Sequence, residues 1–167
     1  VVNLSDGAAD PRGIPRVSVN NRLAGRLAAE HLLERGLQHF GFVGLKGVHY
    51  SEERFAGFND RILEEGLHAV ARFDTPEDAF DSTLAEELTA LGRWLESLPQ
   101  QCGILAVHDY WAQLVMEACA AVGLRVPRDV AVIGMDDDSI VCERSIPTLT
   151  SVCWNSSGIA WEDAALI

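Results

Sequence analysis

Apolar and polar positions follow two different spacings along the chain, and these predict helices and strands in turn. Four segments carry the three-to-four-residue apolar spacing of an amphipathic helix: residues 21–36, 52–66, 82–97 and 109–122. The spacing is clearest in the third, where leucines lie at positions 84, 88, 91, 95 and 98. Glycines at positions 36, 66 and 123 mark three of the helix ends, a common place for glycine.

Short apolar runs predict strands at 16–19, 39–44, 69–73, 103–107 and 149–154. A turn followed by one more strand is expected within 126–134. A further helix is expected from residue 156, and a surface loop over the Gly-, Pro- and Asp-rich residues 6–15. Strands that alternate with helices are typical of an α/β fold with a mainly parallel sheet flanked by helices. The expected core residues of the first two helices are Ala24, Leu27, Ala28, Leu32, Phe55, Phe58 and Ile62.

Composition changes this picture only by excluding partners. The 167 residues carry a net charge of −12, which disfavours direct binding of this segment to nucleic acid or an anionic membrane. Apolar residues make up 48% of the chain, yet no run approaches the roughly 18 residues of a membrane span. None of the four cysteines forms a C-x-x-C pair, and Cys102 and Cys119 lie in apolar runs typical of core thiols. A reduced, cytoplasmic setting is therefore expected.

Polar side chains follow several of the predicted strands. In open parallel sheets, ligands bind at the carboxyl ends of the strands, so these side chains are the first candidates for a site. Carboxylates and amides accept hydrogen bonds from hydroxyl groups, arginine donates in a fixed fork, and an aromatic ring can pack on a sugar ring. The set therefore suits a polyhydroxylated ligand. It comprises Asn3, Lys46, His49, Tyr50, Arg54, His108, Asp109 and Asp136, with Phe80, Trp111 and Trp154 as possible ring-packing residues.

Each candidate also has a purely structural interpretation. Asp109 stands directly before a helix and suits an N-cap, and Asp137 and Asp138 could cap a following turn. Arg54 could be solvated or pair with Glu53. Trp111 and Trp154 could be core residues.

Other chemistry lacks its sequence signature. The glycines of "GFVGLKG" do not match a dinucleotide-binding or phosphate-binding loop, and no G-x-S-x-G elbow is present. No His or Cys spacing supports a metal site, and no nucleophile stands beside a base. We predict neither an enzyme nor a bound metal or cofactor.

Five stretches in order resemble a known family. "RVSVNNRLAGRLAAEHLLERG", "HFGFVG", "SEERFAGF", "GILAVHDYWAQLVMEACAAVGLRVPRDVAVIGMDDD" and "IPTLTSV" are similar to the effector-binding domain of lac-repressor-type transcription regulators. Within that superfamily, "RWLESLPQQCGILAVHDYWAQLVMEAC" and "VCERSIPTLTSV" resemble the xylose-operon regulators most. The resemblance implies a fold like that of periplasmic binding proteins, with a sugar held between two subdomains.

The resemblance also implies site residues and a domain boundary. Arg54 and Asp136 match positions that bind the effector, His108 and Asn3 match polar contact positions, and Phe80 falls where an aromatic packs on the sugar. Asn20 departs from the family, which usually has an acid nearby. The start "VVNLSDG" is typical of the middle of a domain, so residues 1–167 are expected to be a partial domain, mostly its C-terminal subdomain.

The implied function is ligand sensing for a DNA-binding regulator. Such a domain would bind a pentose such as xylose, form a homodimer, and control DNA binding by a domain absent from this chain. In the xylose-operon regulators that domain is an arabinose-regulator-type helix-turn-helix that follows the sensor. The alternative is a periplasmic sugar-binding protein that serves a transporter.

Overall fold

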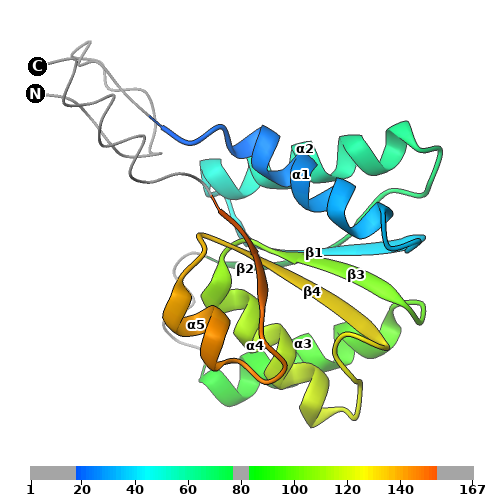
Figure 1. Ribbon diagram of the computed structural model, residues 1–167. Coiled ribbons are helices and arrows are strands. Elements are labelled where there is room, and N and C mark those ends of the chain that lie inside the picture. Colours follow the sequence, from blue (N-terminus) through cyan, green and yellow to red (C-terminus); the bar gives the residue numbers. More distant parts are fainter. Residues whose placement is uncertain (1–17, 77–82, 154–167) are drawn as a thin grey trace, which may run out of the picture.

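A computed structural model describes residues 18–76 and 83–153 of the chain. Its centre is a five-stranded sheet in the order β2-β1-β3-β4-β5, and every neighbouring pair is parallel. Helices α1 and α2 cover one face of the sheet, and α3, α4 and α5 cover the other (Figure 1). The α/β prediction with a parallel sheet flanked by helices is therefore confirmed.

Helices and strands alternate strictly along the described residues. The elements are α1 (Asn21–Leu33), β1 (His39–Lys46), α2 (His49–Glu64), β2 (Ala71–Pro76), α3 (Leu84–Ser97), β3 (Cys102–Ala106), α4 (Asp109–Ala121), β4 (Val130–Met135), α5 (Ser139–Arg144) and β5 (Thr150–Val152).

Most predicted elements are confirmed, with shifted ends. Helix α2 begins three residues before the predicted start, and β2 lies two to three residues further along the chain than expected. The strand expected at 16–19 is wrong over its described part, because residues 18–20 have no regular structure there. Helix α5 was expected only as a capped turn. The loop at 6–15, the helix from 156, Asn3, Phe80 and Trp154 lie outside the described residues.

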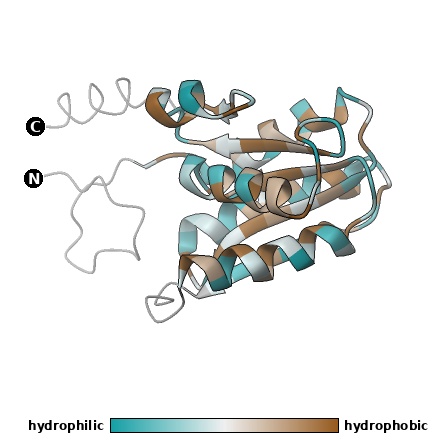
Figure 2. Ribbon diagram, turned by 90° about the horizontal axis from the view of Figure 1, so that it is seen from below, coloured by the Kyte–Doolittle hydropathy of each residue, from teal (hydrophilic) through white to brown (hydrophobic). Residues whose placement is uncertain are grey.

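The core lies on both faces of the sheet. Figure 2 shows the hydrophobic colour gathered on the central strands, and β3 is buried at all five positions. Cys102 and Cys119 are buried as predicted, and Trp111 is a core residue. Leu27 corrects the predicted stripe: it is 46% exposed, while Ala24, Ala28 and Leu32 are buried. The inward face of α1 is thus lined mostly by small residues, which leaves room for a close neighbour.

That neighbour is α2, and two glycines allow the approach. A Cβ added to Gly25 would lie 2.0 Å from the carbonyl oxygen of Arg54, and one added to Gly57 would lie 1.9 Å from that of Arg22. Glycine is required where backbones come this close. The crossing therefore fixes the backbone of Arg54 against α1.

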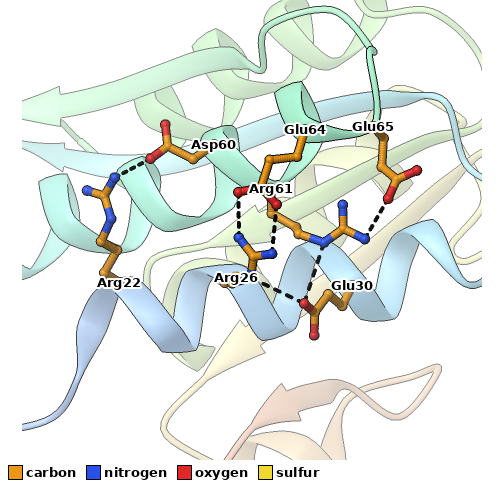
Figure 3. A network of polar contacts seen from close by, with 7 residues as sticks. All are labelled: Arg22, Arg26, Glu30, Asp60, Arg61, Glu64 and Glu65. Atoms are coloured by element: carbon orange, nitrogen blue, oxygen red, sulfur yellow. Dashed lines mark hydrogen bonds and ion pairs between the residues drawn. The ribbon is translucent and has the colours of Figure 1, made fainter.

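Ion pairs on the outer surface join the same two helices (Figure 3). Arg26 donates two hydrogen bonds to the Glu64 carboxylate, at 2.8 and 2.7 Å. Exposed pairs of this kind contribute roughly 0.2–1 kcal/mol each to stability, so the network supports the helix crossing only modestly. The close approach at the two glycines determines how the helices pack. The network consists of Arg22, Arg26, Glu30, Asp60, Arg61, Glu64 and Glu65.

Candidate functional site

The carboxyl ends of β1, β3 and β4 lie side by side, because these strands are neighbours in a parallel sheet. Three predicted site residues meet there. Arg54 comes from α2, which follows β1, while His108 follows β3 and Asp136 follows β4. The order of the strands thus brings together positions that are up to 82 residues apart in the sequence.

Arg54 is the buried centre of this group. Its Nε donates to the side-chain oxygen of Asn21 at 2.9 Å, and a terminal nitrogen donates to the carbonyl oxygen of Val107. The Tyr50 ring lies under the guanidinium, with 5.1 Å between the ring centroid and Cζ, within the range of a cation–π contact. Arg54 is therefore neither solvated nor paired with Glu53, the structural alternatives that the sequence left open.

Asp136 is the exposed partner of this buried cation. One of its carboxylate oxygens lies 3.7 Å from a terminal nitrogen of Arg54. The Asp136 side chain is 37% exposed, whereas that of Arg54 is 6% exposed. The carboxylate thus stands at the surface of the site, where it can accept hydrogen bonds from a ligand.

His108 is the N-cap residue of α4 and lies partly buried beside Arg54. Burial and the positive charge of Arg54 together lower the pKa of His108 to about 4, against the opposing effect of Asp109. The imidazole is therefore neutral near pH 7. A neutral imidazole offers one hydrogen-bond donor and one acceptor, a combination that suits a hydroxyl group.

Asp109 is not the N-cap that the sequence suggested, since His108 holds that position and Asp109 is the first helical residue. Asp138 does cap α5, and its carboxylate accepts from the backbone N–H groups of Ile140 and Val141. The structural interpretation of Asp138 is thus confirmed, and that of Asp109 is replaced by contacts to other elements.

Asn21 was missed by the sequence reasoning, although a signal for it exists. It stands three residues before Ala24 and seven before Ala28, so it belongs to the inward face of α1. It is buried, and its side-chain amide also donates to the carbonyl oxygen of Val19 at 3.3 Å. A polar residue on an apolar helix face is expected to have a buried partner, which here is Arg54.

One hollow in the surface borders the Arg54 group, and another lies apart from it. One of about 260 Å³ shares Asn21 with the Arg54 group and is also lined by Asn20, His49 and Glu53. Another of about 310 Å³ lies between the end of α1 and the start of β4, and does not include Arg54, His108 or Asp136. In residues 18–76 and 83–153, no cluster of three His, Cys, Asp or Glu side chains is arranged to hold a metal ion.

Comparison with known families decides the relationship of this chain. Residues 29–166 match the model of the periplasmic binding protein-like domain. The chain belongs to this family. The matched residues of this chain include Arg54, His108 and Asp136.

Relatives in this family include two curated transcription regulators. The chain is 30% identical over 156 residues to the xylose operon regulatory protein of Haemophilus influenzae, covering 92% of the chain and 40% of the relative. It is 35% identical over 140 residues to the ribose operon repressor of Halalkalibacterium halodurans, covering 83% and 40%. The chain thus spans about two fifths of the length of these relatives. The relatives are regulators, in agreement with the prediction that the chain is not an enzyme.

A solved structure of the family shows the same fold. It is a periplasmic binding protein or LacI transcriptional regulator from Alkaliphilus metalliredigens complexed with D-xylulofuranose. The TM-score is 0.81 at 25% identity, and the match covers 99% of this chain and 59% of that one. Across the part of this chain that the structure describes, no helix is long and apolar enough to span a bilayer.

Proposed function

We propose that this chain is part of the sugar-sensing domain of a DNA-binding transcription regulator. The observation that carries the proposal is the Arg54–Asp136 pair beside His108, at the carboxyl ends of three neighbouring strands. This edge is where ligands bind in open α/β sheets. Its chemistry, a fixed cation, an exposed carboxylate and a neutral imidazole, is that of hydroxyl recognition.

The proposed ligand is a pentose, with D-xylose as the first candidate. The printed names of relatives support this class, since one regulates a xylose operon, one a ribose operon, and one is bound to a pentulose. Asp136, Arg54 and His108 are the proposed contact residues. Asn3 and Phe80 remain proposed contacts from the resemblance alone. The periplasmic transport protein is the weaker alternative, because the curated relatives are transcription regulators.

Regulation then requires coupling between sugar and DNA. We propose that residues 1–167 form mostly one subdomain, that sugar closes it on a second, and that the closed homodimer has a different affinity for DNA. A coupling of about 1–3 kcal/mol is typical of such systems. DNA would be bound elsewhere in the full protein, since this chain carries a charge of −12.

Calorimetric titration of the full-length protein with D-xylose, D-ribose and D-xylulose tests the proposal. One of these sugars is expected to bind, and Asp136→Ala is expected to raise its Kd about 10- to 100-fold, because a hydrogen bond to a charged group contributes about 1.5–3 kcal/mol. Asp129→Ala is the matched control, as that carboxylate binds Arg125 at the opposite end of β4. Full-length protein that binds none of these sugars would overturn the proposal.

A further inference from the structure

Asp109 is a buried carboxylate that the proposed sugar site does not use. It is 2% exposed, and both of its oxygens accept hydrogen bonds. Ser151 Oγ donates to Oδ1 at 2.6 Å, and the backbone N–H of Asp138 donates to Oδ2 at 2.8 Å. The thiol of Cys142 lies 3.6 Å from Oδ2. One side chain at the start of α4 thus connects the loop after β4, helix α5 and strand β5.

These bonds hold the turn that begins at Asp136. The N–H of Asp137 donates to Ser151 Oγ at 3.0 Å, so the serine that donates to Asp109 also accepts from the turn. The N–H of Asp136 donates to the carbonyl oxygen of Val152 at 3.2 Å. All three backbone N–H groups of the aspartate run are therefore fixed, two through Asp109 or its serine partner and one through β5.

The backbone of this turn needs such support. Asp136 has a φ of 115° and Asp137 a φ of 57°, both in the left-handed region that most residues avoid. Residues in this region cost conformational free energy, and they persist where surrounding contacts determine the backbone. The hydrogen bonds that meet at Asp109 are such contacts.

Gly134 makes the approach of Asp109 possible. A Cβ added to Gly134 would lie 2.1 Å from Asp109 Oδ1, so any other residue would displace the carboxylate. Burial raises the pKa of Asp109, which means that the protein keeps this acid away from water at a cost. The Asp109 carboxylate of α4 thus fits a space that residues of β4 and β5 form around it.

We propose that Asp109 is a positioning residue that holds the left-handed turn and thereby sets the Asp136 carboxylate against Arg54. It determines sugar affinity without touching the sugar. The inference deepens the proposed function and rests on it for the readout by binding. The geometry of the turn can be measured independently.

Two variants test the role in the full-length protein. Asp109→Asn removes one acceptor, and Ser151→Ala removes the hydroxyl shared with Asp137. Each is expected to raise the Kd of the bound sugar at least 10-fold while Asp136 and Arg54 are intact. Ser151→Thr keeps the hydroxyl and is expected to restore the affinity to within about 3-fold. Asp129→Asn is the matched control and should leave the Kd unchanged.

Amide hydrogen exchange separates positioning from general destabilisation. Exchange at Asp137 and Asp138 should accelerate at least 10-fold in Asp109→Asn, while β3 amides keep their protection. Unchanged exchange at these two amides, or acceleration spread equally through the sheet, overturns the proposal. If titration of wild-type protein with D-xylose, D-ribose and D-xylulose gives no more heat than a buffer blank, the proposed function fails. The exchange data alone then decide whether Asp109 holds the turn.

Discussion

Arg54 and Asp136 form an ion pair in which one member is buried and the other is exposed. The cation is buried and held by Asn21, the Val107 carbonyl and Tyr50, and the carboxylate faces solvent. A guanidinium with a fixed fork loses little side-chain entropy when it meets another acceptor. The pair therefore presents an oriented charge and an accessible acceptor together, which suits discrimination among the hydroxyl groups of a sugar.

His108 gives a prediction on pH. Its folded-state pKa of about 4 lies below the ordinary value of 6.5, so the unfolded chain binds more protons between these values. The contribution of neutral His108 to the free energy of unfolding is fully present above about pH 6.5 and is lost as the pH falls toward 4. His108→Gln should reduce this loss by up to about 3 kcal/mol. Urea unfolding from pH 4 to 7 measures it, and identical pH profiles for variant and wild type would contradict the assignment.

Single residues also show what the sequence could and could not predict. The proximity of Arg54, His108 and Asp136 could be predicted, because each follows a recognisable strand or matches a family position. The partners of Asp109 could not, because its bonds to Asp138 and Ser151 span 29 and 42 residues. Helical and strand periodicities show which side of an element is buried, and they carry no information on contacts at that distance.

At the scale of elements, the crossing of α1 and α2 positions the site. Asn21 comes from one helix and Arg54 from the other, so a shift between the helices would separate them. The stripe of apolar residues predicted a buried face of α1. It placed Leu27 inward because the pattern cannot show that a second helix approaches so closely that only small residues fit.

Gly25→Ala tests this crossing. Alanine normally stabilises a helix by about 0.5–1 kcal/mol over glycine, but here its Cβ would meet the Arg54 carbonyl. We expect a loss of about 1–3 kcal/mol in the free energy of unfolding. Gly92→Ala is the control, because its Cβ would lie 2.8 Å from a side-chain methyl of Val122 and 3.9 Å from the nearest backbone atom of a neighbouring element, the carbonyl oxygen of Ala118. Denaturant unfolding of both variants measures the difference, and equal effects would contradict the prediction.

At the scale of the whole molecule, the parallel sheet and its flanking helices follow from the alternation of elements alone. The short elements did not follow as well. Helix α5 has six residues, too few to show an apolar period, and the short run at 16–19 did not produce a strand in its described part. Which edge of the sheet carries the site follows from strand direction, a property of parallel sheets as a class.

The proposed homodimer gives a prediction at this scale. Ile146, two residues after the end of α5, is 96% exposed, and Ile140 in α5 and Tyr110 at the start of α4 are also exposed. Large apolar side chains exposed on neighbouring elements are the first candidates for such an interface, and α4 contacts α5. Ile146→Glu should shift the full-length protein toward monomer in equilibrium sedimentation. Leu84→Glu, on the exposed surface of α3, is the control, and a dimer unaffected by Ile146→Glu would exclude this surface.

The bond between Ser151 and Asp109 also has a consequence for biosynthesis. The chain is made from its N-terminus, so Arg54, His108 and Asp136 all leave the ribosome before the serine that supports the Asp136 turn. Contacts between residues far apart in the chain form late, because loop closure must come first. A nascent chain that ends before Ser151 would contain Arg54, His108 and Asp136, yet it would lack the strand that holds the turn at Asp136. The turn at Asp136 should therefore take its folded geometry only when β5 joins the sheet.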